Sequence, residues 1–547
     1  MGFKKNVILF FLCAGTLIAN GQTLEEAQKH FYYKNYNRAA EVLKAVVQKE
    51  PVNMDAWYWL SETFIRQQKD TDAAHAIASA LRVFKDNDLQ EKKNPLVLIG
   101  AAHLAMNSGD SAAARSEMDR VLQLGKYKDP ETLLAVAKAN IESPHGDAAW
   151  AVELLKMAEK RDKRNPAIYV AMGDAYRKLV DGSNAVLSYN EALSADKSYA
   201  EAMYRNGRIY QSQNNPEVYV DRFKRTLEID STYSPAILEL YYYYVERDVV
   251  KAQEMLDAYR RHAEPDTYMD YLQTDLYYLS RKYTEAIAGA RQILSSYPDS
   301  THPRLHKLMA YSYAALKDSA TALSHLEKYF QNQPADKLVA KDFLLKAGLL
   351  ENLNSDKTPA IEWYRKAIAA ETDKKEKVSY MLSLANLQKE LGNEEREAVW
   401  RERIFLDKEG PSNLDLYNWG LALYNAKNYP RADSVFGLYE TKYPEQIYGS
   451  LMRARASARI DTSMELGLAV PHYQRLITVA GKDSVKNKSL LLTAYAYLGT
   501  YEANIRKNYE AALDYFNSML VYEPANEDAI KYTAILKKLI EKQQADN

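Results

Sequence analysis

The chain has 547 residues, and 72 Lys and Arg against 73 Asp and Glu give it a formal net charge of −1 at pH 7. Nucleic-acid affinity rests on a concentrated basic surface, so this near-neutral balance argues against a nucleic-acid partner. Tyr is abundant (43), whereas Gly (20) and Pro (17) are few. We find no strand-period segment long enough to predict a sheet and therefore expect an all-α protein.

The first residues have the pattern of a secretory signal peptide. Two lysines precede an apolar run over residues 7–18, and Ala19 and Gly21 offer small residues for cleavage. The run is too short to cross a membrane, and no later run approaches that length. Cleavage after Gly21, which removes residues 1–21, predicts an exported protein that is periplasmic or outer-membrane-associated. The single Cys13 lies inside the apolar run, so we expect it to be discarded rather than lipidated.

Four short stretches of the chain nearly repeat one another. Residues 34–39 read KNYNRA, residues 281–286 RKYTEA, residues 427–432 KNYPRA and residues 507–512 KNYEAA, and a Pro follows the last Ala of each after 12 residues. A spaced signature that recurs from one end of a chain to the other indicates a repeat array.

A longer pattern precedes this signature. Large residues at its first, fourth and eighth positions form an apolar stripe on a first helix, and a small residue at the fifth position lets a second helix approach closely. A second small residue follows 12 positions later, on that second helix. The pattern is carried by Trp57-x-x-Leu60-Ser61-x-x-Phe64 with Ala73, Tyr169-x-x-Met172-Gly173-x-x-Tyr176 with Ala185, His306-x-x-Met309-Ala310-x-x-Tyr313 with Ala322, and Leu416-x-x-Trp419-Gly420-x-x-Leu423 with Ala432.

This pattern resembles the tetratricopeptide repeat, a helix–turn–helix unit of about 34 residues. The resemblance covers nearly the whole chain after the signal peptide. It implies an all-α fold, a right-handed superhelical α-solenoid of about fourteen repeats. The second-helix position recurs at Ala39, Ala73, Ala113, Ala149, Ala185, Tyr219, Ala252, Ala286, Ala322, Ala360, Ala398, Ala432, Ala469 and Ala511.

The repeats divide the mature chain into three predicted parts. Residues 22–270 form an N-terminal array, residues 271–524 form a C-terminal array continuous with the first, and residues 525–547 form a capping helix and tail. Four consecutive tyrosines, Tyr241 to Tyr244, cover every side of one helical turn. We expect some of them to pack in the core and at least one to reach a surface.

Signatures of enzyme chemistry are missing from the sequence. It has no phosphate-binding loop, no nucleophile elbow and no H-E-x-x-H motif. His302 and His306 are four residues apart, but Pro303 is expected to begin the helix, which leaves His302 outside it. We therefore expect no metal site, no cofactor and no enzyme activity.

The resemblance also implies where partners bind. In that family the first helices line a concave groove, and extended peptides or partner helices bind there. The equivalent positions in this chain mix Tyr, Arg and polar groups. They are Tyr58, Glu62, Arg66, Asp174, Arg177, Lys178, Tyr204, Arg208, Gln211, Lys307, Tyr311, Tyr417, Tyr424 and Asn425.

Two functions are compatible with these features. The first is a non-enzymatic scaffold in the cell envelope that binds protein or peptide partners in the groove. The alternative is a glycan-binding protein of an outer-membrane nutrient-uptake system, which the Tyr content favours. Against it, such proteins typically carry a lipidated N-terminal Cys and long insertions between repeats, and this sequence has neither feature.

Overall fold

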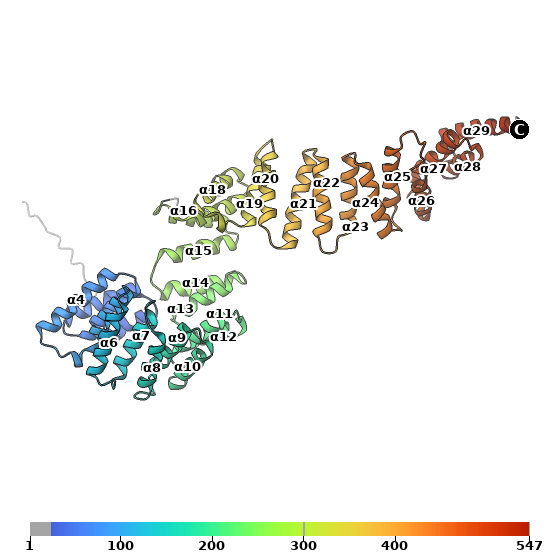
Figure 1. Cartoon of the computed structure of the whole chain (residues 1–547). Coiled ribbons are helices and arrows are strands. Elements are labelled where there is room, and N and C mark those ends of the chain that lie inside the picture. The colour runs from blue at the N-terminus through green and yellow to red at the C-terminus, as the bar shows by residue number, and fades with distance from the viewer. Residues whose placement is uncertain (1–22, 299–300, 546–547) are drawn as a thin grey trace, which may run out of the picture. The chain divides into compact units, whose positions relative to one another are not determined.

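The computed structural model describes residues 23–298 and 301–545 (Figure 1). The described residues form 29 α-helices and no strand, which confirms the all-α prediction. None of these helices has the length and apolar character needed to cross a membrane. The predicted signal peptide and Cys13 lie outside the described residues.

The helices fall into two compact units, an N-terminal unit that ends at Ser296 and a C-terminal unit that begins at Tyr297. Consecutive helices pair as antiparallel hairpins, and each hairpin packs on the next, so the fold is an α-solenoid. The first 28 helices make fourteen hairpins, and α29 packs on α28 at the end.

The N-terminal unit contains eight hairpins. Their helices are α1 (Leu24–Tyr32), α2 (Tyr36–Lys49), α3 (Met54–Arg66), α4 (Asp70–Asp86), α5 (Pro95–Asn107), α6 (Ser111–Leu124), α7 (Pro130–Glu142), α8 (Ala148–Glu159), α9 (Pro166–Lys178), α10 (Gly182–Ala195), α11 (Ala200–Ser212), α12 (Pro216–Ile229), α13 (Ser234–Tyr244), α14 (Val249–His262), α15 (Thr267–Leu279) and α16 (Tyr283–Leu294).

The C-terminal unit contains six hairpins and the terminal helix. Its helices are α17 (Pro303–Ala315), α18 (Ser319–Asn332), α19 (Ala340–Leu353), α20 (Thr358–Ala370), α21 (Lys374–Glu390), α22 (Glu394–Asp407), α23 (Asn413–Asn425), α24 (Tyr429–Lys442), α25 (Ile447–Ile460), α26 (Val470–Ala480), α27 (Lys488–Tyr501), α28 (Tyr509–Tyr522) and α29 (Glu527–Ala545).

The recurring Lys-Asn-Tyr sequence is the turn between the two helices of a hairpin. Lys427 has a left-handed backbone (φ 59°), and the N–H of Asn428 donates to the carbonyl of Leu423, 2.9 Å away. This six-to-one bond closes the first helix. The Asn428 side chain then accepts from the N–H of Arg431 and caps the second helix. One short sequence therefore ends one helix and starts the next.

Small residues allow the close approach of paired helices, as predicted. A Cβ added to Gly173 would lie 2.3 Å from the ring of Tyr189, and one added to Gly420 would lie 2.7 Å from the ring of Phe436. Real Cβ atoms do not approach so closely, so the second helix packs directly on the glycine backbone of the first.

The second-helix position needs four corrections. In most hairpins the buried small residue lies four positions after the residue that caps the second helix, as Ala39 does after Asn35. In three hairpins, counting from the observed cap moves the predicted position one or two residues toward the C-terminus. The prediction was wrong there because a neighbouring Ala fits the sequence pattern equally well. The buried residues are Ala114, Ala151 and Ala512 rather than Ala113, Ala149 and Ala511. In a fourth hairpin Ala469 is itself the residue that caps α26, and the buried residue four positions after it is Tyr473.

The first hairpin of the N-terminal unit contacts the seventh. The ring of Tyr33 packs edge-on against Tyr233 with 5.4 Å between centroids, and its hydroxyl donates to the carboxylate of Asp230. The hydroxyl of Ser234 donates to the carbonyl of Tyr33 at 3.2 Å. Repeats of a solenoid normally contact only their neighbours. This unit therefore closes on itself.

Polar contacts extend the closure into the second helix of the first hairpin. The amide of Asn35 donates to the carbonyl of His262 at 3.1 Å. The carboxylate of Glu264 accepts from the amide of Asn37 at 3.0 Å and from the N–H of Arg38. We call these contacts the clasp, which comprises Tyr33, Asn35, Asn37 and Arg38 on one side and Asp230, Tyr233, Ser234, His262 and Glu264 on the other.

Candidate functional site

The interior of the N-terminal unit is lined by one equivalent position of successive first helices. The ninth residues of α1, α3, α5, α7, α9 and α11 are Tyr32, Glu62, His103, Lys138, Asp174 and Arg208. All but His103 line one cavity, and His103 is buried against Glu62. Helical repetition thus brings residues that are far apart in the sequence to one wall.

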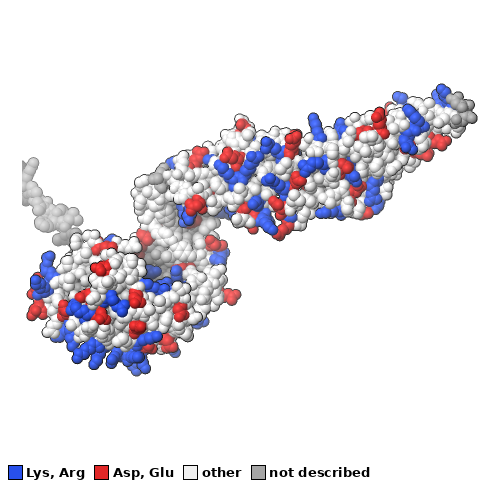
Figure 2. Space-filling model, viewed as in Figure 1, with Lys and Arg blue, Asp and Glu red and all other residues white. Residues whose placement is uncertain are grey.

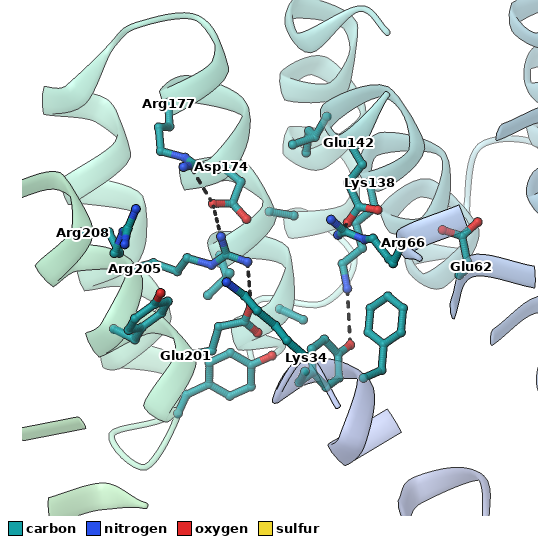
Figure 3. Close-up of a pocket in the computed structure, with 18 of the residues that line it drawn as sticks. Lys34, Glu62, Arg66, Lys138, Glu142, Asp174, Arg177, Glu201, Arg205 and Arg208 are labelled. Atoms are coloured by element: carbon teal, nitrogen blue, oxygen red, sulfur yellow. Dashed lines mark hydrogen bonds and ion pairs between the residues drawn. The ribbon is translucent and has the colours of Figure 1, made fainter. Parts of the chain in front are cut away.

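The cavity has a volume of about 280 Å³ and lies within the unit that the clasp closes (Figure 3). Aromatic rings make much of its wall, and charged side chains make most of the rest. The aromatic residues are Phe31, Tyr32, Tyr36, Tyr58, Trp59, Tyr189, Tyr199, Tyr204 and Tyr233. The charged residues are Lys34, Glu62, Arg66, Lys138, Glu142, Asp174, Arg177, Glu201, Arg205 and Arg208.

Arg205 is the centre of one ion-pair group on the wall. Its guanidinium lies 3.1 Å from Glu201 and 3.6 Å from Asp174. Dashed lines mark these two ion pairs in Figure 3. Asp174 also accepts from the hydroxyl of Tyr189 at 2.8 Å. Burial alone would lower the pKa of Arg205, but the two carboxylates outweigh it and raise the pKa well above its ordinary value. Arg205 is therefore a permanent charge that two acids neutralise.

A second group of polar side chains converges on Glu239 of α13. Its carboxylate accepts from the amide of Gln211 at 2.8 Å, pairs with Arg208, and lies 3.5 Å from the hydroxyl of Tyr204. All three of these residues belong to the predicted groove. The structure therefore brings them together, but onto a carboxylate of the next hairpin.

Glu62, His103 and Glu142 offer ligand atoms within 4.8 Å of one another, the spacing of a candidate metal centre. His103 Nδ1 lies 3.0 Å from both oxygens of Glu62, and Arg66 pairs with Glu142. Burial opposes the charging of His103, but Glu62 outweighs it and raises the pKa of the imidazole. His103 and Arg66 thus already occupy the two carboxylates, and the guanidinium adds a positive charge beside them, so the donor set is that of a polar network and does not fit a metal cation.

The structure places the fourteen predicted groove residues in different surroundings. Seven line the cavity together, namely Tyr58, Glu62, Arg66, Asp174, Arg177, Tyr204 and Arg208. Gln211 lies beside them on Glu239. Lys178 instead donates to the carbonyls of Asn140 and Ser143, where it caps the end of α7.

The remaining five predicted residues belong to the C-terminal unit. Lys307 and Tyr311 both contact the buried carboxylate of Asp342, at 2.7 Å and 2.9 Å. Tyr417 packs against the rings of Phe436, Tyr439 and Tyr448, Tyr424 packs against Tyr429, and Asn425 is the last residue of α23. Binding of a partner by any of the fourteen stays a prediction.

Other cavity residues were not predicted, chiefly Lys34, Lys138, Glu201 and Arg205. A signal existed for Lys138, because it occupies the same helical position as Glu62 and Asp174. Lys34 lies in a turn, and it faces the cavity only because the clasp brings the first hairpin against the seventh. Nothing local in the sequence indicates that contact.

Two further expectations concern His302 and the run of tyrosines. His302 precedes α17 and Pro303 begins it, as predicted. Tyr241 is buried and donates to the carbonyl of Leu272 at 3.0 Å, whereas Tyr242 is 39% exposed. The run is therefore divided between core and surface.

On the face shown in Figure 2, acidic and basic residues are interspersed rather than gathered by sign.

A sequence model described as the tetratricopeptide repeat matches residues 24–88, which are the first two hairpins of the structure. The same helical hairpin recurs throughout the described chain, and most of the hairpins share the left-handed turn. The first two hairpins are tetratricopeptide repeats, and the rest of the described chain repeats their fold. No curated protein matches it.

Solved structures of tetratricopeptide repeat proteins resemble parts of this one. The C-terminal part of a repeat protein from Cytophaga hutchinsonii is 25% identical, covers 48% of this chain and 98% of its own, and has a TM-score of 0.33. A tetratricopeptide repeat protein from Parabacteroides merdae is 19% identical, covers 46% of this chain and 96% of its own, and has a TM-score of 0.32.

Proposed function

We propose that this protein is a non-enzymatic scaffold of the cell envelope that binds protein or peptide partners. The observation that carries the proposal is the row of first-helix residues that turns one mixed aromatic and charged surface toward the interior of the N-terminal unit. Tyr and Arg are the side chains that contribute most to interface energies. The predicted signal peptide supports the envelope location.

Partner binding is tested by affinity capture of the mature chain from an envelope extract of its own source, after mild crosslinking. Arg177, at 51% exposure of its side chain, lies on a first helix and lines the cavity. Arg225, at 52%, lies on the second helix α12. The substitution R177E should reduce the captured partner, whereas the matched control R225E should not. Recovery of no partner, or equal loss in both variants, contradicts the proposal.

Export is tested separately. The full chain should be processed to a mature form that begins at Gln22, and a chain lacking residues 1–21 should stay in the cytoplasm. Mass spectrometry of the purified envelope fraction measures the mature N-terminus. An unprocessed chain in the cytoplasm would remove the envelope from the proposal without affecting the scaffold role.

Glycan binding is the second candidate, because the cavity wall is rich in tyrosine rings. Sugar rings stack on aromatic faces, and neutral oligosaccharides would do so here. A glycan array probed with the mature chain decides between the two candidates. Silence across the array removes the second.

A further inference from the structure

Lys34 extends into the cavity from the turn between α1 and α2 (Figure 3). Within the described part of the chain, no carboxylate forms an ion pair with its ammonium group. Burial, followed by the nearby guanidinium groups of Arg205 and Arg208, lowers the pKa of Lys34, and the weaker attraction of Glu239 does not reverse the shift. The protein therefore holds a lysine where positive charge is already concentrated.

Lys138 reaches the same cavity from α7. Its partner in the described residues is a hydroxyl, that of Tyr32, 3.4 Å away. Burial opposes the charge of Lys138, but Tyr32 and the acids Glu201 and Glu142 outweigh it and raise the pKa. This ammonium is thus charged at neutral pH, without a carboxylate in direct contact.

The acids of the wall are already committed to other cations. Glu142 pairs with Arg66, and Glu62 with His103. Asp174 and Glu201 share Arg205. Glu239, just beyond the cavity wall, pairs with Arg208. Lys34 is exposed to solvent and Lys138 is half-buried, and neither has a carboxylate partner in the described residues, so a negative group that entered the cavity would be attracted to the two lysines.

We propose that the cavity binds a small organic anion, with its acidic oxygens toward the lysines that line the wall, Lys34 and Lys138, and its carbon body against the surrounding tyrosine rings. The volume of about 280 Å³ limits the ligand to a small molecule, because ligand pockets usually begin near 300 Å³. A carboxylate and a phosphate ester share the required chemistry.

The position of Lys34 links this site to the clasp. Lys34 lies between Tyr33 and Asn35, both of which hold the first hairpin against the seventh. An anion that bridges Lys34 to the wall of α7 adds a contact between the first hairpin and the rest of the unit. Binding should therefore slow the opening of the clasp.

Calorimetric titration of the mature chain at constant ionic strength tests the proposal. The probes are phenyl phosphate, citrate, inorganic phosphate and the neutral aromatic benzyl alcohol. We expect one site for phenyl phosphate or citrate, with weaker binding of inorganic phosphate and none of benzyl alcohol. The substitutions K34Q and K138Q should each weaken the binding of the anion at least tenfold.

The chain offers a matched control at Lys427. It occupies the same Lys-Asn-Tyr turn with a left-handed backbone, but in the C-terminal unit, and it does not line the cavity. K427Q should bind the anion like the unsubstituted protein. Gln68 already holds the equivalent turn of the second hairpin at φ 58°, so the Lys34→Gln change keeps an accepted backbone.

Three results would overturn the proposal. They are the absence of binding by every anionic probe at millimolar concentration, equal loss of affinity in K34Q and K427Q, and binding of benzyl alcohol as tight as that of phenyl phosphate. Hydrogen exchange of residues 24–49 gives a second measurement. Exchange should slow when the anion binds, and unchanged exchange at saturation would contradict the link to the clasp.

Discussion

The side-chain amide of Asn35 donates a hydrogen bond to the carbonyl of His262, 227 residues further along the chain. Asn428 occupies the same Lys-Asn-Tyr turn in a later hairpin, but its side chain caps its own second helix. Asn35 makes no such cap. The same tripeptide is therefore a local turn in one repeat and a long-range contact in another.

Replacing Asn35 with Ala should loosen the clasp. The lost hydrogen bond is worth about 1 kcal/mol, and the carbonyl of His262 loses this partner. We expect faster hydrogen exchange in residues 24–49 and 249–264, measured by mass spectrometry.

The control is Asn428→Ala, which removes a helix cap that is also worth about 1 kcal/mol. It should speed exchange only near α24. If both substitutions leave residues 249–264 unchanged, the clasp does not stabilise the N-terminal unit.

Gly420 and Gly348 provide a second matched pair, since both lie inside first helices of the C-terminal unit. A Cβ at Gly420 meets the ring of Phe436, whereas a Cβ at Gly348 meets nothing within 4 Å. G420A should lower the free energy of unfolding by about 1–3 kcal/mol, because the added methyl group overpacks the contact with Phe436. G348A should stabilise by about 0.5–1 kcal/mol, because Ala restricts the unfolded chain and favours helix.

Urea unfolding followed by circular dichroism measures both Gly substitutions. Opposite signs are the expected result. Stabilisation by G420A would show that the two helices of that hairpin are not in direct contact.

Asp342 is fully buried and accepts from the hydroxyls of Tyr311 and Tyr329, from the N–H of Val339 and from Lys307. The carboxylate starts α19 and joins it to the preceding hairpin. The substitution D342A leaves these donors without their acceptor and should cost about 3–5 kcal/mol. Hydrogen exchange over residues 303–353 should report the loss.

The substitution K307M offers the comparison for Asp342. Lys307 is about one-third exposed, and the carboxylate keeps three donors without it, so its loss should cost less than the loss of Asp342. A larger effect from K307M would contradict the assignment of Asp342 as the organising group.

The imidazole of His103 should titrate above its ordinary pKa of about 6.5, because Glu62 stabilises the charged ring in spite of burial. The substitution E62Q removes that charge, and burial should then lower the pKa below the ordinary value. NMR titration of labelled histidines measures both shifts. His30, whose pKa burial lowers, gives a reference in the same unit.

The sign of the effect on stability follows from the raised pKa. Protonation favours the folded state, so the stability that His103 contributes is fully present below about pH 6.5 and is lost as the pH rises through the folded pKa. A pKa for His103 at or below that of His30 would contradict the pairing with Glu62.

Sequence patterns predicted the hairpins well because the interactions that form them are local. A left-handed turn at Lys427, a cap at Asn428 and a glycine at position 420 all act within one repeat. The same reasoning found half of the groove residues in the cavity, since helical position alone turns them inward. The prediction of the small contact residue was wrong where several alanines lie close together. Each of them fits the sequence pattern, and only the observed helix cap shows which one is buried.

The clasp and the charges it brings together could not be predicted in this way. Asn35 and Asn428 have the same neighbours in sequence, so no local rule separates their roles. Lys34 joins the cavity through contacts with residues 230–264, and those depend on how the hairpins between them turn together.

A solenoid can ordinarily gain or lose a repeat without harm, because each unit meets only its neighbours. The contact between Tyr33 and Ser234 removes that freedom here. The hairpins from α3 to α12 set the distance between these two residues. One hairpin more or fewer would move Tyr33 and Ser234 out of contact. Evolution by duplication of repeats is thus constrained in this half of the molecule. An inserted or deleted hairpin there should break the contact that Tyr33 makes.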